Sequence, residues 1–304
     1  DGGNGSDLLQ IGANFNDTSD AQIVNIETVT ITSGSLVVNL ADQTEALSIN
    51  GSSGADTIIA GGANDTINGN DGADSIAAGN GNNVVSAGNG NDTVVLGNGN
   101  DSIDLGDGND SITAGANFNA GDTVVGGLGA DTLAFTDDQT GTNDLDNVTG
   151  FETFILGDVT SSITTVDNLA ASGATIVVDA SALTSTHSLT WNASAETNGK
   201  FSVTGGAGND TITGGASDDT ILSGNGDDSV VTGNGNNVVD AGNGNDTVVD
   251  GTGNDTITTG LGADVVTLSG NGNNVVNSGD GADTITLGTG ADSISSGNDN
   301  DSIM

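Results

Sequence analysis

The sequence predicts an all-β fold, an elongated right-handed parallel β-roll or β-solenoid made of stacked turns. Three observations support it: a repeat of fixed period, a branched aliphatic residue at one place in each repeat, and glycines between those aliphatics. An anchoring Asp or Asn recurs every nine residues from 56 to 110 and again from 210 to 264. Self-similarity at a fixed period indicates an architecture in which neighbouring repeats stack.

Each repeat predicts one tight loop and one very short strand. Glycines before the anchor permit the positive φ angles of a tight turn. Two residues after the anchor stands Ile or Val, as at Ile58, Val94 and Ile212. Strand alternation turns that residue inward and its neighbours outward, and Leu96 and Leu105 are expected to point inward too. Two repeats then form one flattened turn, and the turns stack in parallel around a thin aliphatic core.

The chain is also an internal duplication. The stretch GNGNNVVSAGNGNDTVV at 79–95 returns at 233–249 with a single change, and the anchors of the two runs correspond at an offset of 154 residues. The predicted organisation is therefore a β-solenoid segment at 1–50, a first β-roll run at 51–113, a longer solenoid segment with an insertion at 114–204, and a second β-roll run at 205–304.

Composition restricts the partners of this chain. Its 304 residues include 42 acids and one base, for a formal charge of −41, and no cysteine. Low hydrophobicity with high net charge is typical of disorder, but disorder does not require the fixed spacing of the aliphatic residues. The charge excludes nucleic acid as a partner and repels anionic membranes, and no apolar run is long enough to span a bilayer. Divalent cations are favoured instead.

The anchors predict calcium sites. Calcium prefers six to eight oxygen ligands from carboxylates and main-chain carbonyls, and stacked turns bring equivalent anchors and glycine-rich loops together along each edge. Columns of carboxylates would repel one another without a cation between them. Adjacent loop pairs give about fourteen predicted Ca²⁺ sites. The candidate ligands are Asp7, Asp56, Asp65, Asp74, Asn83, Asp92, Asp101, Asp110, Asp131, Asp210, Asp219, Asp228, Asn237, Asp246, Asp255, Asp264, Asn274, Asp283, Asp292 and Asp301.

Segments such as GNGNDTVVL at 88–96, LGNGNDSID at 96–104 and TGGAGNDTITGG at 204–215 resemble the repeats-in-toxin (RTX) β-rolls of secreted Gram-negative proteins. The resemblance covers about 51–113 and 205–303, and it implies an extracellular, calcium-loaded roll. The segments between the runs resemble the β-solenoid stretches of bacterial RTX-type surface-layer proteins. Asn83, Asn237 and Asn274 depart from the pattern by removing one carboxylate. Calcium beside Asn83 and Asn237 is predicted to be the weakest held, or absent.

Catalytic motifs are missing. With one histidine, His187, and no cysteine, neither an HExxH zinc site nor a thiol nucleophile is possible, and no G-x-S-x-G sequence occurs. His187, Trp191, Lys200 and Phe201 gather in the longer solenoid segment, where they predict a small packed protrusion or contact patch. The Thr rows of the loops are too irregular to predict an ice-binding surface.

The expected function is structural, not enzymatic: a calcium-dependent protein of the bacterial exterior that assembles with itself into a surface layer or filament. A head-to-tail junction would place Asp301 and Asp7 ten residues apart, the step that already separates Asp264 and Asn274. The alternative is a stiff spacer within a large secreted RTX adhesin, and a folding module of an enzyme is a weaker third. Cell-surface polysaccharide is a further candidate partner. No signal peptide is visible, which indicates a mature product or a fragment.

Overall fold

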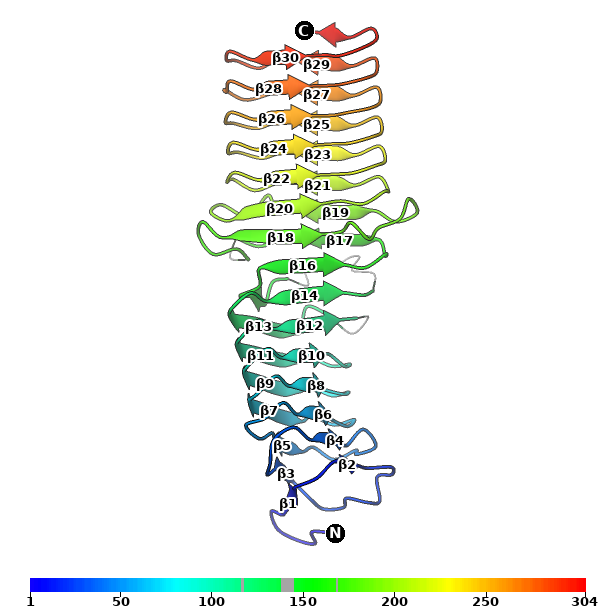
Figure 1. Ribbon diagram of the computed structural model, residues 1–304, viewed down its shortest axis with the longest axis vertical. Helices are drawn as coiled ribbons and strands as arrows, with labels where there is room; N and C mark the ends of the chain where they lie inside the picture. The colour runs from blue at the N-terminus through cyan, green and yellow to red at the C-terminus, as the bar shows by residue number, and fades with distance from the viewer. Residues whose placement is uncertain (116–117, 138–144, 168) are drawn as a thin grey trace. The chain divides into compact units, whose positions relative to one another are not determined.

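The computed structural model describes residues 1–115, 118–137, 145–167 and 169–304, and this part of the chain contains strands and no helix (Figure 1). It forms two compact units, Asp1–Ala134 with Asn147–Phe151, and Phe135–Asp146 with Glu152–Met304. The four segments predicted from the sequence stay a prediction.

The first unit contains two parallel sheets whose strands alternate along the chain. One sheet contains β1 (Leu8–Ile11), β3 (Thr28–Ile31), β5 (Ser48–Asn50), β7 (Thr66–Asp71), β9 (Val84–Asn89), β11 (Ser102–Asp107), β13 (Thr123–Leu128) and β15 (Val148–Thr149). The other contains β2 (Phe15–Asn16), β4 (Val37–Asn39), β6 (Thr57–Ile59), β8 (Ser75–Ala77), β10 (Thr93–Val95) and β12 (Ser111–Ala114). β14 (Thr132–Phe135) crosses the sequence boundary between the units.

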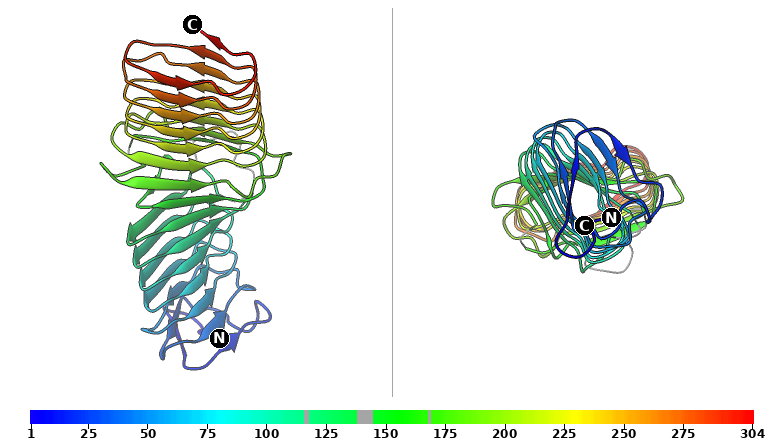
Figure 2. Two further views of the ribbon diagram at one scale, coloured as in Figure 1. Left: turned by 45° about the horizontal axis from the view of Figure 1, so that its top comes forward. Right: turned by 90° about the horizontal axis from the view of Figure 1, so that it is seen from below.

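The second unit repeats this arrangement, and its successive turns lie one above the other in Figure 1 and in the left view of Figure 2. One sheet contains β16 (Thr153–Leu156), β18 (Thr175–Asp179), β20 (Lys200–Thr204), β22 (Thr220–Leu222), β24 (Val238–Asp240), β26 (Thr256–Thr258), β28 (Val275–Asn277) and β30 (Ser293–Ser295). The other contains β17 (Ser161–Thr164), β19 (Leu189–Asn192), β21 (Thr211–Thr213), β23 (Ser229–Val231), β25 (Thr247–Val249), β27 (Val265–Thr267), β29 (Thr284–Thr286) and β31 (Ser302–Ile303). The all-β parallel solenoid predicted from the sequence is confirmed.

Strand register explains the core. Each inward aliphatic pairs with the equivalent residue one turn away, as Val94 does with Ile76 and Ile112, and Val94 is completely buried. Leu96 and Leu105 are buried as expected. Within the two runs, stacking branched side chains in parallel fills a narrow space without aromatic residues, so a period read in the sequence becomes an aliphatic column.

The prediction of a protrusion or contact patch is wrong for Trp191 and Phe201. Trp191 lies on β19 in register with Ile163 and Ile212, and both aromatic side chains are buried. Their rings meet edge to face at a centroid distance of 5.7 Å. They therefore fill the core of turns that carry longer loops.

His187 and Lys200 are half-buried in the same region. The His187 ring nitrogen Nδ1 lies 2.8 Å from an Asp158 carboxylate oxygen, and the Lys200 ammonium lies 3.4 Å from Asp218. Partly exposed ion pairs of this kind contribute little to stability, and these two link residues 18 and 29 positions apart in the sequence.

Candidate metal-binding loops

The anchors form continuous columns along both edges of each run. One carboxylate oxygen, Oδ1, accepts a hydrogen bond from the backbone N–H of the anchor one turn earlier. The N–H of Asp74 reaches Asp92 at 2.7 Å, and that of Asp228 reaches Asp246 at 2.9 Å. The columns are Asp56–Asp74–Asp92–Asp110, Asp65–Asn83–Asp101, Asp210–Asp228–Asp246–Asp264 and Asp219–Asn237–Asp255.

The columns continue where the spacing changes. The Asp110 N–H donates to Asp131 Oδ1, and the Asp101 N–H donates to Asp122 Oδ1. Both pairs are separated by 21 residues. In the second run the same backbone-to-side-chain hydrogen bonds extend one column from Asp264 through Asp283 to Asp301. They extend the other column from Asp255 through Asn274 to Asp292. Asp122 was missed from the sequence because an insertion hides its place in the period, although Asp122-Thr123-Val124 carries the signature of a repeat.

Many anchors keep a second carboxylate oxygen, Oδ2, that is buried and receives no hydrogen bond. The clearest cases are Asp74, Asp92, Asp110, Asp246 and Asp283. Burial raises the pKa of Asp74 to about 6 and that of Asp246 to about 7, and neighbouring carboxylates of the same column add to the rise. A buried oxygen without a donor is costly, so these loops need a proton or a cation.

The loop backbone beside these oxygens has a recurrent shape. Before Asp92, Gly88 and Gly90 have φ angles of +118° and +135°; before Asp246, Gly242 and Gly244 have +96° and +146°. A Cβ atom at Gly90 would lie 1.7 Å from the Gly72 carbonyl oxygen of the turn before. Glycine is therefore required there both for the left-handed backbone and for the close stacking of carbonyls on the next turn.

Asn83 and Asn237 reveal which groups such a loop presents to its anchor. The Asn83 side-chain nitrogen donates to the carbonyls of Gly79 and Gly81 at 3.2 and 3.1 Å. The Asn237 nitrogen donates to the Gly235 carbonyl at 3.2 Å. Carbonyl oxygens thus face the anchor side chain, and in these two loops a side-chain N–H group lies where an Asp loop would need a cation.

Asn274 makes a different contact. Its nitrogen donates to Asp250 Oδ2 at 3.1 Å, across one turn. Asp250 is buried at a loop position where most repeats carry a small or aliphatic residue. Sequence reasoning missed Asp250, whose only signal is this unusual acid five residues before the anchor Asp255.

Two glutamate carboxylates also accept backbone hydrogen bonds, one in the place of an anchor and one within a loop. The Asp7 N–H donates to Glu27 Oε2 at 2.7 Å, so Glu27 takes the place that the next anchor holds in the runs. Gly3 and Gly5, before Asp7, have positive φ. Glu196 is fully buried, and its carboxylate accepts hydrogen bonds from the N–H groups of Ala170, Asn198 and Gly199. Its role is to close a loop.

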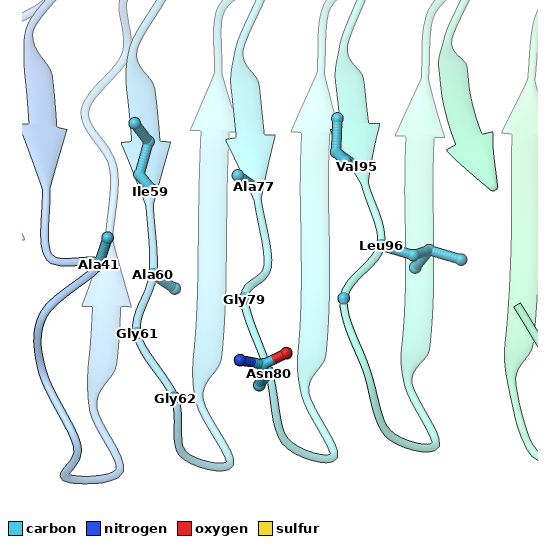
Figure 3. Close-up of a pocket in the computed structure, with 11 residues that line it drawn as sticks. Ala41, Ile59, Ala60, Gly61, Gly62, Ala77, Gly79, Asn80, Val95 and Leu96 are labelled. Carbon is cyan, nitrogen blue, oxygen red and sulfur yellow. The ribbon is translucent and has the colours of Figure 1, made fainter. Parts of the chain in front are cut away.

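An open pocket crosses the loops at one edge of the first unit (Figure 3). Gly61 and Gly79, from successive loops, line it with Ala60, Asn80 and Leu96. No titratable side chain is among its lining residues. The pocket therefore offers no acid, base or nucleophile for catalysis.

The residues present fit a cation that prefers oxygen ligands. Within the described ranges no group of three or more His, Cys, Asp or Glu side chains is placed to hold a metal. A cation would therefore be held by carboxylate oxygens of the anchors together with loop carbonyls, the combination that calcium accepts. The ligand set predicted from the sequence stays a prediction in its individual residues.

Comparison with known families agrees with this chemistry. The family model of the RTX calcium-binding nonapeptide repeat matches residues 50–85, 86–120, 117–134, 204–239, 240–269 and 268–303. These matches cover more than half of the chain, which therefore belongs to the family of RTX calcium-binding repeat proteins. A comparison with curated proteins returns no matching relative.

Membership of this family gives the coarse properties of the chain. RTX nonapeptide repeats bind Ca²⁺, their β-rolls are generally structural elements, and proteins that contain them are typically secreted. In the part of the chain that the structure describes, no helix is long and apolar enough to cross a membrane.

Proposed function

We propose that this chain is a non-enzymatic, calcium-dependent structural protein of the bacterial exterior that assembles with copies of itself into a surface layer or filament. Calcium is held between stacked loops by the anchor carboxylates and the loop carbonyls. It offsets the repulsion within each carboxylate column and makes the fold depend on the ion, because metal binding at such sites is coupled to folding.

The observation that supports assembly is the open ladder of the outermost strands. Among the described residues β1 pairs only with β3, and β31 only with β29. Ile303 on β31 is 49% exposed. An unpaired parallel edge offers N–H and C=O groups to a further turn. A second copy that supplies this turn by a head-to-tail contact generates an open fibre.

The test is electron microscopy of the full chain in millimolar calcium and in excess chelator. Fibres or sheets in calcium that disperse in chelator are expected. Ile303→Lys places a charge on the open edge and should abolish assembly while calcium-dependent folding persists. The control Leu261→Lys changes a 54% exposed loop residue and should leave assembly intact. Discrete monomers of the parent chain in millimolar calcium would overturn the proposal.

The second candidate is a stiff spacer in a large secreted adhesin. The same open ladder favours it, because further repeats of one longer polypeptide would complete the edge equally well. A chain that folds with calcium but stays monomeric at high concentration supports the spacer. A cell-surface polysaccharide partner is tested by adding purified polysaccharide to the calcium-loaded chain and measuring co-sedimentation.

A further inference from the structure

We propose that the loops anchored on Asp56, Asp210 and Asp219 take no calcium, so that each run opens with loops closed by their own backbone N–H groups. This inference rests on the proposed calcium binding of the later loops. It assigns a different role to three residues that the nine-residue spacing alone does not distinguish from the other anchors.

Both oxygens of each of these carboxylates are already used. Asp56 Oδ2 accepts the N–H and hydroxyl of Ser52 at 2.8 and 2.9 Å. Asp210 Oδ2 accepts the Gly206 N–H at 2.8 Å, and Asp219 Oδ2 accepts the Gly215 N–H at 2.7 Å. Every donor lies four residues before its anchor. The later anchors Asp74, Asp92 and Asp246 receive no such bond.

The other oxygen of each anchor, Oδ1, accepts a backbone hydrogen bond from the segment that precedes the run. Asp56 Oδ1 accepts the Leu36 N–H at 2.8 Å, Asp210 Oδ1 the Leu189 N–H at 2.7 Å, and Asp219 Oδ1 the Phe201 N–H at 2.8 Å. All three anchors are 1% exposed. Each carboxylate thus accepts two N–H donors, and Asp56 accepts the Ser52 hydroxyl as well. At Asp210 and Asp219 these bonds stabilise the charged form against the burial that raises the pKa of both carboxyls.

The loop backbone explains the difference. In the loops before Asp210 and Asp219, Gly206, Gly208, Gly215 and Ser217 all have φ angles outside the left-handed region. The equivalent glycines before Asp228, Gly224 and Gly226, have φ of +112° and +119°. The first conformation turns an N–H toward the anchor. The second matches the loop of Asn83, where carbonyls face the anchor.

An N–H group directed at the carboxylate is incompatible with calcium at that oxygen. Calcium requires oxygen lone pairs around it, and the N–H would place the positive end of its dipole against the ion. Ser52 and Ser217 also stand where the later loops of both runs carry mostly glycine, and a serine adopts positive φ only at a cost. The opening loops are therefore predicted to form without the ion.

The loaded crystal structure, with anomalous scattering from calcium, is the direct test. Ion density is expected beside Asp92 and Asp246 and absent from the loops 206–210 and 215–219. Density in those loops as strong as beside Asp246 overturns this inference and leaves the calcium function intact. If no loop of either run holds an ion, the proposed function fails.

Solution measurements on paired variants test the same assignment. Asp219→Asn directs an amide N–H at the Gly215 N–H, so it should lower the melting temperature without changing the number of bound ions in native mass spectrometry. Asp246→Asn creates a loop like that of Asn237 and should reduce the number of ions. Equal ion loss in both variants overturns the inference. If Asp219→Asn does not fold, hydrogen exchange of the parent chain in chelator is the test. The backbone amides of Leu189 and Phe201 should stay protected after those of Asp228 and Asp246 have exchanged. The reverse order of exchange overturns the inference.

Discussion

Asn83→Asp should have opposite effects in the absence and presence of calcium. The substitution removes two hydrogen bonds, from the side-chain nitrogen to the Gly79 and Gly81 carbonyls at 3.2 and 3.1 Å. It places a carboxylate oxygen against both carbonyls in a residue that is 1% exposed. Each lost bond is worth about 1 kcal/mol, and an unsatisfied buried group costs about 1–3 kcal/mol. The calcium-free folded state should therefore lose about 3–5 kcal/mol.

With calcium bound, the substitution should instead stabilise the folded state, because the new carboxylate completes the set of oxygen ligands found in an Asp loop. Circular dichroism during a calcium titration should show folding of the variant at a higher midpoint concentration and a higher melting temperature at saturation. Native mass spectrometry should count at least one additional bound ion. Asn82→Asp is the matched control, since it adds the same charge on the exposed neighbouring residue. An unchanged ion count, or the same shifts in the control, would refute the assignment of the Asn83 amide to the place of a cation.

Three further perturbations follow from the same geometry. Gly90→Ala should prevent proper stacking of the first run and sharply lower its melting temperature, because its Cβ would lie 1.7 Å from the Gly72 carbonyl oxygen at a φ of +135°; Gly62→Ala, with its nearest neighbour at 3.8 Å, is the control, and equal melting temperatures would contradict the argument. Ile257→Ala should cost about 2–5 kcal/mol in chemical denaturation at saturating calcium, because Ile257 is completely buried in the aliphatic column, whereas Leu222→Ala at a 43% exposed site should cost little. The calcium-free fold should lose stability as pH rises from about 4 to about 7, because burial raises the pKa of Asp228 to about 6 and that of Asp246 to about 7, so the folded state holds protons that the unfolded chain releases. Apparent calcium affinity should rise over the same pH range as these carboxylates deprotonate, and a circular dichroism signal in chelator that is equal at pH 5 and pH 8 would argue against the pKa shifts.

Local pattern was sufficient to predict the columns because the repeat is strictly regular. Ile58, Val94 and Ile212 are buried where the period places them, and Asp74 and Asp92 stack as their spacing requires. Where the spacing changes, the pattern fails. Asp122 and Asp131 stay in register after a single insertion of three residues between Asp110 and Asp122, because the parallel pairing of β11 with β13 holds the next anchor in place.

The sequence by itself determined the stacked parallel turns, the inward aliphatic residues and the edge on which each regular anchor lies. These follow from a period of nine and from the alternation of side chains along a strand. Only the tertiary structure decided which groups contact the carboxylate oxygens of each anchor. Asp210 and Asp246 both stand between an Asn and a Thr, yet one accepts an N–H group of its own loop and the other keeps a buried oxygen without a donor. The direction of a loop peptide depends on the turn stacked against it, and that contact is not encoded within a single repeat.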